Sequence, residues 1–115
     1  MDKKIDVRTF DFALEVINSY KFLISKREFV LSKQLLRSGT SIGANVQESQ
    51  AAQSKKDFIA KMAIASKEAR ETKYWITLLL KSGYFADYQN VDTLLKDIES
   101  IINILTKIVK TSQTR

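Results

Sequence analysis

Three glutamates are the clearest candidates for chemistry in this chain: Glu48, Glu68 and Glu71. Carboxylates on neighbouring helices can hold a metal ion, and such a metal could hydrolyse a phosphodiester. The carboxylate sites of helical bundles, however, pair glutamate with histidine, and this chain has no histidine and no cysteine. We therefore expect no metal, no cofactor, no catalytic residue and no enzyme. We expect instead a half-buried polar seam in which these glutamates, Arg37 and Asn45 satisfy one another.

A segment with two glycines precedes the last two glutamates. Residues 37–46 read RSGTSIGANV, with Gly39 and Gly43 four residues apart. Glycine inside a helix costs about 1 kcal/mol relative to alanine, so two of them need a reason. A phosphate-binding loop is one interpretation, but the Gly-Lys-Ser/Thr ending of a P-loop is missing. We favour the other interpretation, in which both glycines lie on one helix face and let a neighbouring helix approach closely.

Basic residues collect on one side of the segment that follows. The chain has 19 Lys and Arg against 13 Asp and Glu, a formal charge of +6, which favours polyanionic partners. At 100° per residue, six cations of residues 55–81 fall within a sector of about 120° that holds none of the segment's carboxylates. They are Lys55, Lys56, Lys67, Arg70, Lys73 and Lys81. Such a face would bind the phosphates of RNA or DNA with little reading of sequence. The alternative is that these cations only keep the protein soluble.

The composition indicates long helices in one domain. The chain has no proline and three glycines in 115 residues, which argues against β folds because their turns need these residue types. The length is that of a single domain over 1–115. The absence of cysteine suits a reducing compartment. Because neither a membrane-spanning run nor a signal peptide is visible, we expect a cytoplasmic protein without a membrane partner.

The spacing of apolar residues predicts four helices. The first covers residues 5–24. The second follows a Ser-x-x-Glu capping box at 25–28 and runs to about 52. The third opens at Ser54 and stops at 82–83, and the fourth follows Asn90 and ends near 110. Because the connections are short, consecutive helices should be antiparallel. We thus predict an all-α, up-down-up-down antiparallel four-helix bundle with frayed ends at about 1–4 and 111–115.

The first predicted helix is apolar on two sides. Val7, Phe10, Leu14 and Ile17 share one face, and Phe12, Val16 and Leu23 lie on a second face roughly 160° away. One bundle interior covers only one of these faces. Since large exposed apolar patches usually mark interfaces, we expect a homo-oligomer.

Two motifs in the chain resemble a known protein family. Residues 34–48, QLLRSGTSIGANVQE, and residues 64–75, IASKEARETKYW, are similar to signatures of the bacterial four-helix bundle proteins also called the 23S rRNA-intervening sequence protein family. The resemblance covers about residues 5–110. Its structural motif positions are Arg37, Gly39, Ser41, Gly43, Asn45, Glu48, Glu68, Glu71 and Trp75.

The resemblance implies a homo-oligomer, with a pentamer as the form associated with the family. It also implies a remote likeness to the accessory variability determinant of diversity-generating retroelements, a basic pentameric bundle that binds nucleic acid and a reverse transcriptase. It implies no catalytic residues. Two functions remain as alternatives: an accessory protein that binds RNA or DNA through the basic face, or a scaffold that docks another protein.

Overall fold

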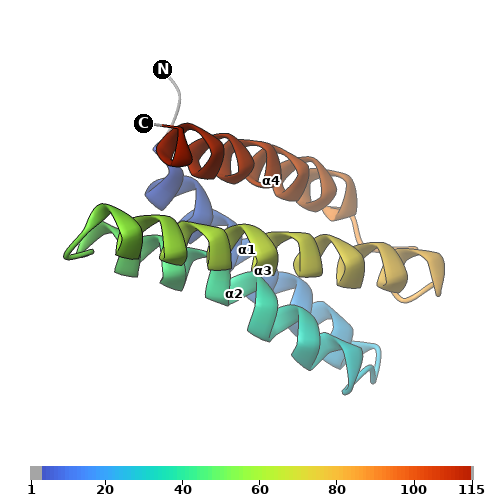
Figure 1. The fold of residues 1–115 in the computed structure, drawn as a ribbon. Coiled ribbons are helices and arrows are strands. Elements are labelled where there is room, and N and C mark those ends of the chain that lie inside the picture. Colours follow the sequence, from blue (N-terminus) through green and yellow to red (C-terminus); the bar gives the residue numbers. More distant parts are fainter. Residues whose placement is uncertain (1–3, 115) are drawn as a thin grey trace.

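The computed structural model describes residues 4–114, which form four helices (Figure 1). They are α1 (Ile5–Ser25), α2 (Leu31–Gln50), α3 (Lys55–Lys81) and α4 (Val91–Gln113). Each helix packs against its neighbours in the chain, and α4 packs back on α1. Consecutive helices run antiparallel (Figure 1). The predicted all-α four-helix bundle is confirmed. None of the four described helices combines the length and the apolarity needed to cross a membrane.

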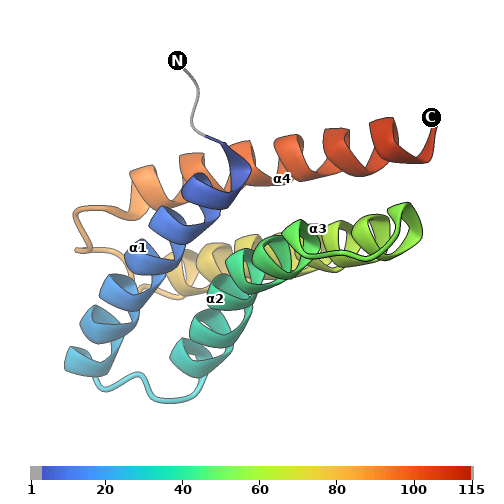
Figure 2. The ribbon, with the colours of Figure 1, turned by 90° about the vertical axis from the view of Figure 1, so that its left-hand side faces the viewer.

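The four helices form two hairpins that are inclined to each other. Figure 2 shows α1 and α2 side by side, crossing the pair formed by α3 and α4. The contact between α2 and α3 is the most extensive, and that between α1 and α4 is the least extensive. The arrangement leaves one side of α1 without a covering helix.

The core contains the apolar positions that the spacing predicted. Of the two apolar faces of α1, the buried one carries Phe12, Val16 and Leu23, each at most 1% exposed. The chain also closes the loop end of the bundle with aromatic rings, because Phe85 of the α3–α4 connection is buried against Phe22 and Tyr88. No buried side-chain nitrogen or oxygen of the described residues lacks a hydrogen-bond partner. The buried polar side-chain atoms of the described residues are therefore satisfied.

The two helix glycines lie where α1 approaches α2. A Cβ atom built on Gly39 would stand 2.7 Å from both methyl groups of Val16, and one on Gly43 would stand 3.2 Å from the carbonyl oxygen of Thr9. Ordinary carbon–carbon contacts lie at about 3.5–4.0 Å. Any side chain at Gly39 would therefore push the helices apart, which is the close approach that the sequence predicted.

The start of α2 differs from the prediction. We expected the helix to follow Ser25 directly, but Ser25 still belongs to α1, and α2 begins six residues later at Leu31. Arg27 takes a left-handed backbone conformation with φ of 64°, which ends α1. Glu28 then accepts the first free N–H groups of α2, from Leu31 at 2.9 Å and from Ser32 at 2.6 Å. The capping carboxylate therefore precedes its helix instead of lying within the first turn.

The other helix ends follow the prediction more closely. Ser54 accepts a hydrogen bond from the N–H of Asp57 at 3.0 Å and caps α3, and Gly83 has φ of 95° just after its end. Asn90 occupies the cap position of α4, but its side chain makes no capping hydrogen bond. We expected the chain to fray from Thr111 onwards. This prediction is wrong for residues 111–113, because α4 continues to Gln113. The expected fraying at 1–3 and at 115 lies outside the described residues.

Candidate nucleic-acid interface

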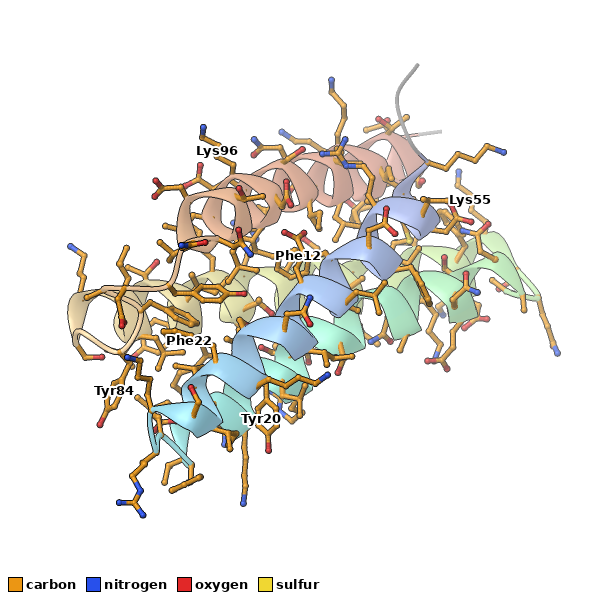
Figure 3. The ribbon with its side chains drawn as sticks, turned by 180° about the vertical axis from the view of Figure 1, so that it is seen from behind. Phe12, Tyr20, Phe22, Lys55, Tyr84 and Lys96 are labelled. Atoms are coloured by element: carbon orange, nitrogen blue, oxygen red, sulfur yellow. The ribbon has the colours of Figure 1, made fainter. Side chains whose placement is uncertain are left out.

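All six cations predicted on one face of α3 are exposed to solvent. From Lys56 to Lys81 they extend about 37 Å along the helix at 1.5 Å per residue. Figure 3 labels Lys55 at one end of the molecule and Tyr84, just after the end of α3, at the other. The cations therefore span nearly the whole length of the bundle.

The neighbouring helix α4 engages two of these cations. Arg70 donates a hydrogen bond from Nη2 to Oγ1 of Thr106 at 2.9 Å. The ammonium group of Lys73 lies 3.5 Å from a carboxylate oxygen of Glu99, and both side chains are about half exposed. We expected the basic face of α3 to hold no carboxylate, and among the residues of α3 this is the case. On the folded surface the expectation is wrong, because α4 brings Glu99 beside Lys73.

Helix α4 also adds cations that were not predicted from the sequence. Lys96, Lys107 and Lys110 are exposed and lie on the same row of α4 as Glu99, at spacings that return to one face of a helix. Because Glu99 contacts Lys73, this row runs beside the cations of α3, and Figure 3 shows Lys96 directed away from the bundle. The spacing in the sequence was the available signal, but only the packing of α4 on α3 brings the two rows together. We define the basic surface as the six cations of α3 and these three of α4.

An exposed aromatic ring lies on the same helix. Tyr74 is 59% exposed and stands edge-on to Trp75, with ring centroids 5.1 Å apart. The neighbouring Lys67 and Lys81 are exposed as well. An exposed aromatic ring of this kind offers a stacking platform for a nucleotide base.

The polar seam between α2 and α3 is narrower than predicted. Arg37 forms ion pairs with Glu68, at 3.3 Å, and with Glu71. The indole N–H of Trp75 also donates to Glu71, at 2.9 Å. The hydrogen bond from Trp75, which has the largest effect, and that from Arg37 hold the pKa of the Glu71 carboxyl below its usual value. The charges of the two glutamates are thus directed at protein donors in the α2–α3 contact.

Asn45 and Glu48 do not join this network, contrary to our expectation. Asn45 donates to the backbone oxygen of Ser41 at 2.9 Å within α2, and Glu48 pairs with Lys61 at 3.3 Å. A side chain of this length two or three turns farther along the helix does not reach Arg37. Among the described residues, no three metal-ligating side chains lie close enough to hold an ion.

One face of α1 presents large apolar side chains to solvent. Val7 is 44% exposed, Phe10 63% and Leu14 49%, whereas Ile17 of the same row is half-buried. We define these first three residues as the α1 stripe. It lies on a different helix from the basic surface and has a different chemistry, so two kinds of contact are available on one small molecule.

Comparison with known proteins places the chain in a family and gives a similar solved structure. A family model described as 23S rRNA-intervening sequence protein matches residues 2–107. A solved structure from Bacteroides thetaiotaomicron VPI-5482, described as a protein with unknown function from the S23 ribosomal protein family, is 44% identical and superposes with a TM-score of 0.88. That similarity covers 93% of this chain and 99% of the other. No curated protein matches the sequence.

Proposed function

The chain belongs to the 23S rRNA-intervening sequence protein family, and on that premise we propose that it is a non-enzymatic, cytoplasmic homo-oligomer that binds RNA or DNA through the basic surface. The observation that carries the proposal is the alignment of nine exposed cations along two packed helices. Their extent of about 37 Å on α3 is comparable to one turn of duplex DNA.

The basic surface would bind phosphates by releasing counterions. Each lysine that neutralises a phosphate frees a condensed cation, which gives an affinity that falls steeply with salt and depends little on sequence. Tyr74 could add base stacking where a strand is unpaired. Lys67 and Lys81 are the strongest individual candidates, because Arg70 and Lys73 already have partners on α4.

Self-association is the second part of the proposal. The α1 stripe exposes three large apolar side chains in a row, and burying them against another copy removes apolar area from water. We take the pentamer that the family resemblance implies as the expected form. In such an assembly the basic surface is repeated on every protomer, so weak individual contacts gain avidity.

The binding part is tested by salt titrations with matched charge variants. Lys67→Gln with Lys81→Gln removes two charges from the basic surface. Lys4→Gln with Lys21→Gln removes two exposed charges elsewhere and serves as the control. Fluorescence anisotropy with labelled single strands and duplexes, between about 50 and 200 mM salt, measures affinity and slope. We expect the first variant to lower the slope of log affinity against log salt by about 1.4 on single strands or 1.8 on duplexes.

The control variant should keep the parent's slope. Equal effects of both variants would mean that net charge alone matters and that the basic surface is not the site. A parent protein that binds neither nucleic acid at physiological salt would refute the binding proposal and leave the scaffold function.

The scaffold function is the second candidate, and the α1 stripe favours it because an apolar stripe suits a protein partner. The solution mass distinguishes a scaffold that self-associates through the α1 stripe from one that uses the stripe to dock another protein. Light scattering should give five times the 13.2 kDa of the chain, and Phe10→Ser should lower that mass. A parent mass of 13.2 kDa would refute self-association and reserve the stripe for another protein.

A further inference from the structure

The loop between α1 and α2 is held in place by backbone hydrogen bonds. Arg27 donates its N–H to the carbonyl of Ile24 at 2.9 Å, and Glu28 donates its N–H to that of Leu23 at 3.0 Å. With Arg27 at φ of 64°, these two bonds form the Schellman ending of a helix. Glycine is the usual residue at this left-handed position, because a side chain is disfavoured there.

The acidic residue of this loop is turned inward. Glu28 is 6% exposed, and its two carboxylate oxygens accept the N–H groups of Val30, Leu31 and Ser32 at the start of α2. Burial acts to raise the pKa of Glu28, but these N–H groups together hold it below its usual value. The negative charge of Glu28 is therefore compensated by hydrogen bonds within the loop and is not exposed to a partner.

The remaining side chains of the loop point outward. Phe29 is 50% exposed and Val30 is 71% exposed, and neither belongs to the apolar side chains packed on the core. Arg27 and Lys33, on either side of them, are exposed cations. This hydrogen-bonded segment thus exposes an aromatic ring and an aliphatic side chain that are flanked in the sequence by two exposed positive charges. We define these four residues as the loop patch.

We propose that the loop patch binds unpaired nucleotides, with a base stacked on Phe29 and the flanking phosphates on Arg27 and Lys33. This inference rests on the proposed function and names its substrate class: nucleic acid that contains single-stranded bases. Aromatic rings stack on any base, because every base has a π face, and cations beside the ring follow the backbone. The preformed loop loses little conformational freedom when it binds.

The charge of the patch favours nucleic acid over a second copy of the chain. Within residues 27–33, Arg27 and Lys33 are exposed cations, and the one acid of this stretch, Glu28, is buried. Two identical patches facing each other would bring like charges together. A strand of phosphates instead supplies the opposite charge at regular intervals.

Three substitutions test the inference by anisotropy on a labelled single strand and on a duplex of the same sequence. Phe29→Leu keeps an apolar side chain but removes the ring, and Phe29→Tyr keeps the ring as the matched control. We expect Phe29→Leu to weaken single-strand binding roughly 5- to 150-fold, with duplex affinity unchanged. Phe29→Tyr should bind as the parent does.

Arg27→Gly separates binding from folding. Glycine adopts the left-handed conformation without penalty, so the melting temperature should rise. The salt slope on single strands should nevertheless fall by about 0.7, the value of one lost phosphate contact. A variant that is more stable yet binds more weakly cannot have lost affinity by unfolding.

The results distinguish failure of this inference from failure of the proposed function. If Phe29→Leu binds single strands as the parent does while Lys67→Gln with Lys81→Gln still weakens binding, the loop inference is wrong and the basic surface stands. If the parent binds neither strand form, both fail. If Phe29→Leu weakens binding to phosphatidylglycerol vesicles but not to the single strand, the patch is a membrane contact and the inference is overturned.

Discussion

Replacing Gly39 by alanine tests how closely α1 and α2 approach. In an exposed helix interior this change would stabilise the protein by about 1 kcal/mol, because alanine has the better helix propensity. Here the new Cβ would lie 2.7 Å from both methyl groups of Val16, almost 1 Å inside ordinary contact distance. Val16 is fully buried, and a β-branched side chain has few alternative rotamers. Overpacking of this kind costs about 1–3 kcal/mol, so we expect a net loss of about 1 kcal/mol.

A double-mutant cycle isolates the contact. Val16→Ala alone should cost about 2 kcal/mol, for the lost methyl groups and the cavity they leave. Combined with Gly39→Ala, the added methyl fills part of that space, so the double variant should be more stable than the sum of the single effects predicts. We expect a coupling energy of at least about 1 kcal/mol.

Urea unfolding followed by the fluorescence of Trp75 measures these energies. The protein concentration must be held constant, because any self-association adds to apparent stability. Ala44→Gly, at an exposed position of the same helix, calibrates the propensity difference at about 1 kcal/mol. If Gly39→Ala stabilises the protein by as much as Ala44→Gly destabilises it, and if it shows no coupling to Val16→Ala, then the two helices do not approach closely at Gly39.

Three further predictions concern the helices and the pH dependence of stability. Ala69→Pro, at a buried position inside α3, should cost about 3 kcal/mol or more by removing a backbone hydrogen bond, and circular dichroism should show lost helicity. Glu28→Ala should cost about 1–2 kcal/mol in urea unfolding because the capping carboxylate is lost; an unchanged stability would mean that water replaces it. Burial, together with a hydrogen bond to Asp97 and its negative charge, raises the pKa of Glu15 to about 8. Since the folded state then holds this proton more tightly than the unfolded chain, the stabilisation is complete below about pH 4.5 and declines towards pH 8. Glu15→Gln should therefore raise the melting temperature at pH 8 but not at pH 4, and parallel pH profiles of the parent and the variant would contradict the raised pKa of Glu15.

The helices and their buried faces could be predicted from local pattern. The row of Phe12, Val16 and Leu23 is buried because a helix repeats every 3.6 residues and the apolar side of that repeat must leave water. The cap at Ser54 and the stop at Gly83 were also readable, because they depend on backbone groups within a few residues. The cations of α3 share a face for the same local reason.

The roles of individual polar side chains depended on groups far away in the chain. Lys73 is paired because α4 brings Glu99, which is 26 residues away in the sequence, next to it. The apolar periodicity of single helices does not specify which residues of two helices come into contact. Asn45 has the spacing expected of the polar seam, but its amide donates instead to the backbone oxygen of Ser41 in its own helix. The Ser-x-x-Glu box marked a helix start in the right region but assigned the cap to Ser25, since the pattern contains no information on where the backbone turns. That turn is fixed by Arg27 in the left-handed region and by the burial of Glu28. Local periodicity thus determined the elements and their faces, whereas the partners of each polar side chain were decided by helix packing, which brings together groups that the sequence keeps apart.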